Sequence, residues 1–318
     1  MLVSATTPQI IVREVGPRDG LQSIKSTMPT AVKIHWIGAM VEAGIREMEV
    51  ASFVPPATMP QMADGGDVVR RIRAERPHLH AVALAPNLRG ATSAAAAGAQ
   101  AIVIPVSASE AHSRSNVRRR TAEQVNAVAD IVKYVRTLDV QPRIEGGIST
   151  AFGCSIQGVV PEGDVIALAA ALVEAGVDTV MLADTLGYAT PSQVKRLVRA
   201  VRNEVGAERL GHLHFHDTFG TAIANVYAAL EEGVRGFDSA ARGLGGCPYA
   251  PGAAGNVATE DLIYFLESEG LSTGIDLPAF IAAGANLQTV FPGEKFYSRL
   301  ATAGIPPTFH SSHRTIKV

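Results

Sequence analysis

The segment Val173-Glu-Ala-Gly-Val177, with the strand-like run Thr179–Leu182 directly after it, carries the pattern from which the fold can be predicted. Its glycine stands where the C-terminus of a helix commonly needs the left-handed conformation. The same order of helix, glycine and strand recurs at Val41–Ile45, Ala96–Ala99 and Leu230–Val234. Such a repeat is typical of alternating β and α units around a parallel sheet.

About eight strands can be counted along the chain, each paired with a helical stretch. The strands are predicted near residues 10–15, 46–51, 80–85, 101–106, 142–148, 178–183, 210–215 and 235–240. The helices are predicted near residues 30–43, 61–75, 88–97, 121–138, 163–175, 191–205, 221–232 and 258–269. Eight such units in about 260 residues match a (β/α)8 TIM barrel.

The alternative fold is an open, doubly wound α/β sheet. That fold predicts a G-x-G-x-x-G turn after the first strand, and Val15-Gly-Pro-Arg-Asp-Gly20 does not have this pattern. We therefore predict one TIM-barrel catalytic domain over residues 1–275. Residues 276–318 lack the repeat, and we expect a C-terminal helical extension that packs on the barrel and ends in a loose tail.

Composition excludes several classes of partner. The chain has 318 residues, 47% of them hydrophobic, and a formal net charge of -2. This charge gives no general attraction to nucleic acid or to an anionic membrane. No window of about 18 apolar residues is present, so no membrane span is expected. The local run Arg118-Arg119-Arg120 fits a solvated helix start better than a patch for ligand phosphates.

The cysteines and the N-terminus indicate the compartment. Cys154 and Cys247 lie far apart and form no disulfide framework, which fits a reducing environment. Residues Met1–Pro8 have neither the basic region nor the apolar core of a signal peptide. We expect a cytoplasmic protein, and a homodimer or a higher homo-oligomer stays open.

The stretch His214-Phe-His-Asp217 gives the first indication of chemistry. It closes a predicted strand, and residues two apart on a strand point to the same face. His214 and His216 therefore direct two imidazoles into one space. This arrangement suits a divalent metal, although the spacing alone also allows a pair of core or surface histidines.

Polar residues gather where the predicted strands end, which is where TIM barrels place their active sites. These residues are Arg18, Asp19, Gln22, Glu49, Ser52, Asn87, Ser149, Cys154, Asp184, Thr185, His214, His216, Cys247 and Asn256. Each has an ordinary reading as well: Asp184 could be a helix cap, and Cys247 a small apolar residue. Their convergence on one face of the barrel favours a functional site.

Four of these residues form a candidate metal site. Asp19, His214, His216 and Asn256 would provide a mixed oxygen and nitrogen set with positions left for a ligand or water. Such a set suits Mg²⁺ or Mn²⁺, with Zn²⁺, Co²⁺ or Fe²⁺ as alternatives. Arg18, next to Asp19, can present a fixed cation to a developing oxyanion.

The segment Gly243–Gly255 contains five glycines and Cys247. It is either an ordinary surface loop or a mobile lid that carries Cys247 over the metal. The basic residue Arg242 precedes it, and this cation either pairs with a substrate carboxylate or faces solvent.

At these residues the chain resembles the 3-hydroxy-3-methylglutaryl-CoA lyase family, barrel metallolyases related to isopropylmalate and homocitrate synthases. The resemblance runs in order from about residue 10 to 270 through seven segments. They are Glu14-Val-Gly-Pro-Arg-Asp-Gly-Leu-Gln22, Ala51–Val54, Pro86–Gly90, Ala183–Gly187, His214–Gly220, Gly243-Leu-Gly-Gly-Cys-Pro-Tyr-Ala250 and Gly255–Leu262.

The resemblance implies a role for each site residue. It implies that Asp19, His214, His216 and Asn256 bind the metal. It further implies five catalytic residues, which are Arg18, Glu49, Asp184, His214 and Cys247. Among them, Arg18 polarises the thioester oxygen, Glu49 and Asp184 orient the site, and Cys247 acts from the lid. Substrate contacts are implied for Arg18, Gln22, Lys25, Ser52 and Asn87, and the partner is an acyl-CoA.

The implied reaction is a metal-dependent retro-Claisen cleavage of 3-hydroxy-3-methylglutaryl-CoA to acetyl-CoA and acetoacetate. Asp19 or His214 is the candidate base for the C3 hydroxyl proton, and His214 or Cys247 would protonate the enolate. The chain departs from the family at two places. Gly153-Cys-Ser-Ile-Gln-Gly158 replaces Gly-Cys-Pro-Tyr-Glu-Gly, and Ala240-Ala-Arg-Gly243 replaces Ser-Val-Ala-Gly.

Both departures leave the chemistry intact but the acyl group of the substrate open, so other functions stay open. One is a lyase for a related 3-hydroxyacyl-CoA such as citramalyl-CoA. Another is a condensing acyl-CoA synthase, against which the lid motif argues. A third is a metal-binding scaffold without activity, against which Arg18, Glu49 and Cys247 argue.

Overall fold

Eight parallel strands close into a barrel in the computed structural model, which describes residues 9–246 and 255–310. The strands are β1 (Ile11–Glu14), β2 (Glu47–Ser52), β3 (His80–Leu84), β4 (Ala101–Ser107), β5 (Arg143–Ser149), β6 (Thr179–Asp184), β7 (Leu210–Phe215) and β8 (Gly236–Ser239). Each strand pairs with the next, and β8 pairs with β1. The TIM-barrel prediction is confirmed, and the open doubly wound alternative is wrong.

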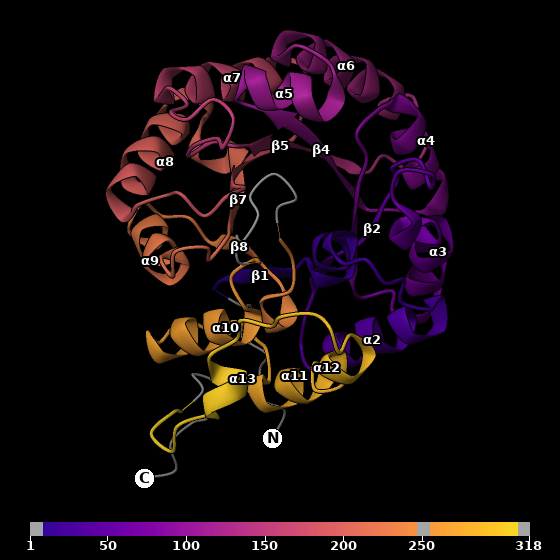
Figure 1. Ribbon diagram of the computed structural model, residues 1–318. Coiled ribbons are helices and arrows are strands. Elements are labelled where there is room, and N and C mark those ends of the chain that lie inside the picture. Colours follow the sequence, from indigo (N-terminus) through magenta and orange to yellow (C-terminus); the bar gives the residue numbers. More distant parts are fainter. Residues whose placement is uncertain (1–8, 247–254, 311–318) are drawn as a thin grey trace, which may run out of the picture.

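Helices form a ring around the barrel (Figure 1). The ring helices are α2 (Thr30–Glu42), α3 (Gly65–Glu75), α4 (Leu88–Ala97), α6 (Thr121–Val135), α7 (Glu162–Glu174), α8 (Pro191–Val205), α9 (Ala222–Glu231) and α10 (Thr259–Ser268). Shorter helices are the π-helix η1 (Gly16–Gly20), α1 (Leu21–Ser23), the 3-10 helices η2 (Pro60–Met62), η3 (Ala207–Arg209) and η4 (Ala241–Gly243), and α5 (Glu110–Val117). The sequence did not predict α5, because its residues are mostly polar.

The repeated glycines end the helices in the way that the sequence predicted. Gly44, Gly98, Gly176 and Gly233 all have φ between +83° and +115°, a region that residues with a Cβ rarely adopt. The chain turns back toward the barrel at each of them and enters the next strand. The repeat of strand and helix along the sequence thus depends on backbone conformation as well as on hydrophobicity.

The floor of the barrel is ionic. Arg13 on β1 is fully buried, and its guanidinium contacts Glu47, Glu145 and Asp238 at 3.5, 2.7 and 2.7 Å. These carboxylates come from β2, β5 and β8, so the contacts cross the interior. Arg143 adds a second cation to Glu145. The sequence did not predict this network.

The C-terminal extension contains α11 (Leu277–Ala283), α12 (Leu287–Val290) and α13 (Leu300–Ala303). It lies beside α2 and α10 (Figure 1), and the Asp276 amide donates to the Ala43 carbonyl at 2.7 Å. The tail predicted for the last residues, 311–318, lies outside the described part of the chain.

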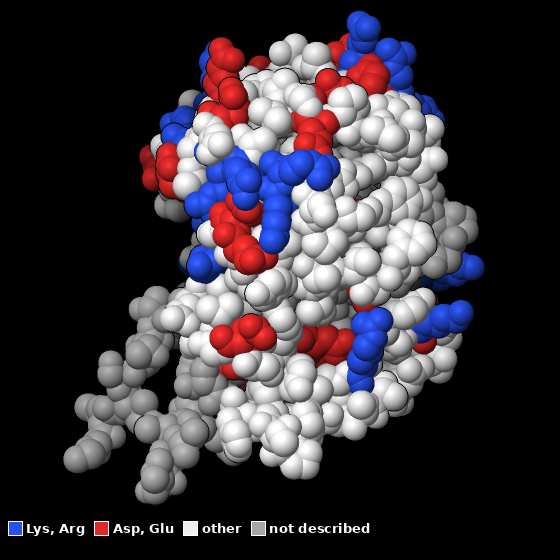
Figure 2. Space-filling view, turned by 90° about the vertical axis from the view of Figure 1, so that its left-hand side faces the viewer, with Lys and Arg blue, Asp and Glu red and all other residues white. Residues whose placement is uncertain are grey.

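Basic and acidic side chains lie next to one another at several places on the face that Figure 2 shows, with uncharged residues between these groups. Neighbouring helices on the outside of the barrel are joined by ion pairs, such as Lys195–Glu231 at 2.7 Å and Arg199–Glu232 at 2.6 Å. Among the described helices, none combines the length and apolar character that crossing a membrane would need.

Candidate active site

Three side chains of the types that bind metals meet where β1 and β7 end. One ligand atom each from Asp19, His214 and His216 lies within 4.8 Å of the others. Asp19 belongs to η1, directly after β1, whereas His214 lies on β7 and His216 just beyond it. The two imidazole rings are 5.2 Å apart between centroids, as the two-residue spacing on one strand face predicted. The structure therefore brings together three of the four residues proposed as metal ligands.

Asn256 completes this group. Its Nδ2 donates to Asp19 Oδ2 at 2.7 Å, and its backbone forms a bridge with that of His216. Its Oδ1 is buried and accepts no hydrogen bond from any described residue. A Cβ at Gly245 would lie 2.5 Å from Asn256 Nδ2, so this glycine makes room for the amide. A buried amide oxygen without a donor, next to a carboxylate and two imidazoles, fits a hard divalent cation.

Arg18 is fixed between two carboxylates. Its Nη1 contacts Asp19 Oδ1 at 2.5 Å, and its guanidinium also pairs with Glu49. Burial alone would raise the pKa of Asp19, but Arg18, the two histidines and the Asn256 amide together lower it to about 2. Asp19 is therefore ionised at neutral pH. Glu49 belongs to the site as the partner of Arg18.

A second carboxylate reaches His214 from inside the barrel. Asp238 Oδ2 lies 3.2 Å from His214 Nδ1, and Arg13 holds the same carboxylate from below. Burial lowers the pKa of His214, but the hydrogen bond to Asp238 and the charge of Asp19 outweigh it and leave the pKa above its ordinary value. The sequence analysis missed Asp238, although an acidic residue in the middle of a buried strand was a usable signal.

A cavity of about 760 Å³ opens next to these residues. Eight of the residues that the sequence placed at the barrel mouth line it: Arg18, Asp19, Gln22, Asn87, Ser149, Thr185, His214 and His216. Three polar residues of α5 and the turn after it also line it, namely His112, Asn116 and Arg119, and the first two were not predicted. Arg119 belongs to the basic run, so one of its arginines faces the cavity.

Other predicted residues have different surroundings. Asp184 accepts the amides of Tyr188 and Ala189 at 2.8 and 3.0 Å, and burial raises its pKa to about 6. Ser52 is buried, and its hydroxyl has no hydrogen-bond partner among the described residues. Lys25 is exposed and is not among the residues that line the cavity. The predicted acid Cys247 lies outside the described residues.

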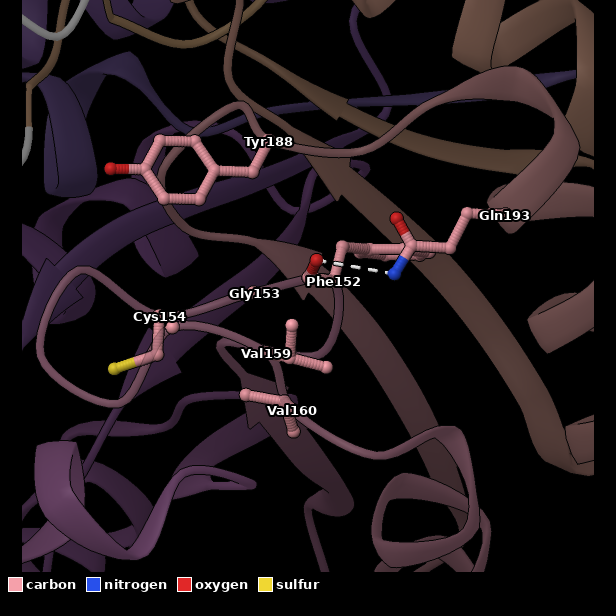
Figure 3. Close-up of a pocket in the computed structure, with 8 residues that line it drawn as sticks. Phe152, Gly153, Cys154, Val159, Val160, Tyr188 and Gln193 are labelled. Carbon is pink, nitrogen blue, oxygen red and sulfur yellow. Dashed lines mark hydrogen bonds between the residues drawn. The ribbon is translucent and has the colours of Figure 1, made fainter.

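The unusual loop after β5 shapes a separate pocket of about 390 Å³ (Figure 3). Gln193 lines this pocket and donates to the Phe152 carbonyl at 3.2 Å, and Tyr188 also lines it. The sulfur of Cys154 points away from Gln193, and it accepts from Ser109 Oγ at 3.1 Å. Cys154 therefore serves the packing of this loop and does not line the cavity of about 760 Å³.

Arg242 has an environment that neither sequence interpretation anticipated. Its guanidinium lies 5.8 Å from the centre of the Phe296 ring in the C-terminal extension. Its backbone amide donates to Glu260 at 2.9 Å, and its carbonyl accepts the Tyr297 amide at 2.9 Å. The side chain thus packs between barrel and extension and does not line the cavity.

Replacing Arg242 with alanine should lower stability and leave substrate preference unchanged. Loss of the contact with Phe296 should cost about 1 kcal/mol, which thermal unfolding can measure. The matched control is Arg196→Ala, which removes an exposed arginine from α8 and should change the melting temperature little. A selective loss of kcat/KM for dicarboxylic acyl-CoA esters would instead place Arg242 in substrate binding.

The whole sequence was also compared with known proteins. The family model described as HMGL-like matches residues 9–286. The chain belongs to the HMGL-like family. The resemblance seen in the sequence motifs is thereby confirmed.

Two curated members of this family and one solved structure show how far the similarity extends. A 3-hydroxy-3-isohexenylglutaryl-CoA/hydroxy-methylglutaryl-CoA lyase of Pseudomonas aeruginosa is 42% identical over 91% of this chain and 95% of its own length. The hydroxymethylglutaryl-CoA lyase of Bacillus subtilis is 39% identical over 86% of this chain and 91% of its own. The structure of an HMG-CoA lyase from Acinetobacter baumannii, in complex with coenzyme A and 3-methylmalate, covers 95% of this chain and 97% of its own, with a TM-score of 0.88 and 39% identity.

Proposed function

We propose that this protein is an enzyme that cleaves 3-hydroxy-3-methylglutaryl-CoA to acetyl-CoA and acetoacetate. The observation that carries the proposal is the cluster of Asp19, His214 and His216, with Arg18 beside it, at the mouth of the barrel. In the reaction the C3 hydroxyl loses its proton, the C2–C3 bond breaks, and its electrons form the enolate of acetyl-CoA. A proton added to C2 then completes acetyl-CoA. Two relatives that are named as lyases of this kind support the assignment, because the similarity extends over most of their length.

Mg²⁺ or Mn²⁺ is the proposed cofactor, held by Asp19, His214, His216 and Asn256. Two of these residues offer oxygen and two offer nitrogen, which is the donor set that such cations accept. When bound, the cation supplies a Lewis acid that polarises the oxygens of the substrate and lowers the pKa of its hydroxyl.

Arg18 is the proposed stabiliser of the enolate. Its contacts with Asp19 and Glu49 hold the guanidinium in place before the substrate arrives, so that no reorganisation is needed when negative charge develops. Glu49 acts through Arg18 and is a positioning residue. We propose the same kind of role for Asp184, since its carboxylate orders the loop after β6.

The geometry separates the candidates for proton transfer. Asp19 is a weak base, with its pKa near 2, but its carboxylate is the proposed acceptor of the C3 hydroxyl proton. Nδ1 of His214 contacts Asp238, so only Nε2 is left for the cluster. Because Nε2 cannot bind a metal and carry a proton at the same time, we assign His214 to metal binding. This leaves Cys247 as the proposed donor of the proton to C2.

The acyl-CoA is proposed to occupy the cavity of about 760 Å³. Gln22 and Asn87 line it and are the better placed of the proposed substrate contacts, whereas Ser52 and Lys25 do not line it. The solved relative in complex with coenzyme A supports this class of substrate. A cytoplasmic location remains our proposal, supported by the two isolated cysteines.

Incubation of the purified protein with 3-hydroxy-3-methylglutaryl-CoA and Mg²⁺ or Mn²⁺ should yield acetyl-CoA and acetoacetate, identified by mass. Prior treatment with a chelator should abolish turnover, and renewed cation should restore it. Citramalyl-CoA and the isohexenyl ester belong in the same panel to test the acyl group. Release of free coenzyme A alone would indicate thioester hydrolysis and would refute the proposed cleavage.

A further inference from the structure

The contact between His214 and Asp238 joins the metal cluster to the ionic floor of the barrel. His214 Nδ1 lies 3.2 Å from Asp238 Oδ2, while its ring also takes part in the cluster with Asp19 and His216. We propose that Asp238 is a further positioning residue of the site: it accepts the Nδ1 proton of His214 and so presents the lone pair of Nε2 to the cation. This inference rests on the proposed metal site and extends it to a residue that does not touch the cation.

The register between β7 and β8 places His214 and Asp238 side by side. His214 on β7 and Asp238 on β8 are directly paired in the parallel ladder, so their side chains point to the same side of the barrel wall. Asp238 is 1% exposed, and water therefore does not compete for its oxygens. A short side chain on the neighbouring strand is enough to reach the imidazole.

Arg13 fixes the acceptor in turn. Its Nε donates to Asp238 Oδ1 at 2.7 Å and its Nη2 to Oδ2 at 3.2 Å, a two-point contact that sets the plane of the carboxylate. The oxygen that faces His214 is therefore held by Arg13 on one side and by the imidazole on the other. Hydrogen bonds thus connect the barrel floor through Arg13 and Asp238 to His214, and they fix the position of its imidazole in the cluster.

The third histidine on the same face of β7 shows that this support is specific. His212 lies two residues before His214, and its nearest carboxylate contact is Glu47, at 3.7 Å. That distance is too long for a hydrogen bond. A metal-binding histidine commonly donates its second nitrogen to a carboxylate, which fixes the tautomer and the ring orientation. Of His212 and His214, only the latter is placed both to do this and to reach the cluster.

Asp238→Asn tests the inference, since asparagine keeps the shape but loses the charge and can offer a donor to Nδ1. We expect the Kd for Mn²⁺, measured by calorimetry on chelator-treated protein without substrate, to rise about 10- to 100-fold. The matched control is Glu145→Gln. Glu145 also accepts from Arg13, at 2.7 Å, and is equally buried, but no contact joins it to His214. It should lose comparable stability and keep the wild-type Kd.

A measurement on the wild-type protein covers the case in which Asp238→Asn does not fold. Nitrogen-15 spectra of the histidines, without metal and above the pKa of His214, should show the Nδ1-protonated tautomer for the signal that disappears in His214→Gln. The Nε2-protonated tautomer would overturn the inference, and so would an unchanged Kd in Asp238→Asn. Wild-type protein that binds no Mn²⁺ would overturn it together with the metal site. Tight Mn²⁺ binding without cleavage of the acyl-CoA would overturn only the proposed function.

Discussion

Replacing Arg18 with glutamine should lower kcat by about a hundredfold and change KM much less. The guanidinium is placed for charge that develops only during bond cleavage, and loss of one such contact typically costs about 3 kcal/mol. Steady-state kinetics with 3-hydroxy-3-methylglutaryl-CoA would measure both parameters. An effect on KM alone would show that Arg18 binds the ground state of the substrate and does not stabilise the enolate.

The control for this variant must separate catalysis from folding. Arg18→Gln leaves the buried Glu49 without its cation, and an unpaired buried carboxylate is itself destabilising. The double variant Arg18→Gln/Glu49→Gln removes that charge as well. It should recover much of the lost thermal stability while kcat stays low. Recovery of kcat along with stability would mean that Arg18 matters for the fold and not for the reaction.

Replacing His216 with alanine should remove most of the affinity for Mn²⁺ and with it the turnover. His216 offers one of the three ligand atoms that lie within 4.8 Å of one another. The loss should exceed the 10- to 100-fold effect expected for a residue that only supports a ligand. Calorimetry with Mn²⁺ and an activity assay would measure the two quantities on the same preparation.

His212→Gln is the matched control for His216→Ala. His212 is buried on the same face of β7 but contacts Glu47 at the barrel floor. Its replacement should disturb the floor and leave Mn²⁺ affinity close to that of the wild type. Equal losses of affinity in both variants would indicate that β7 has been distorted, and a wild-type affinity in His216→Ala would refute its role as a ligand.

The sequence predicted those features that depend on local order. Helix-ending glycines such as Gly98 and Gly176 show where each helix stops, because they meet a conformational need that few other residues satisfy. The spacing of His214 and His216 shows that their side chains share a face, because strand geometry has a period of two. Barrel topology then places strand ends together, which brought Asp19 close to these histidines.

Features that depend on contacts between residues far apart in the sequence could not be predicted from it. Arg13 meets Glu145 and Asp238, which are 132 and 225 residues away, and no periodicity connects them. The role of α5 was missed for a related reason: His112 and Asn116 line the cavity only because the chain returns over β4. Arg242 looked like a cation near the substrate, but the C-terminal extension contacts it instead.

The hydrogen bond between Asn256 and Asp19 joins residues 237 positions apart, one after the first strand of the barrel and one after the last. The ligand set cannot assemble until β8 has paired with β1, since the seam between these strands brings the two residues together. A cation at this place would hold the two ends of the barrel together, because it binds the closed barrel and not the open chain. Its binding free energy would then add to the stability of the closed barrel, and β1 and β8 would separate most readily when no cation is bound.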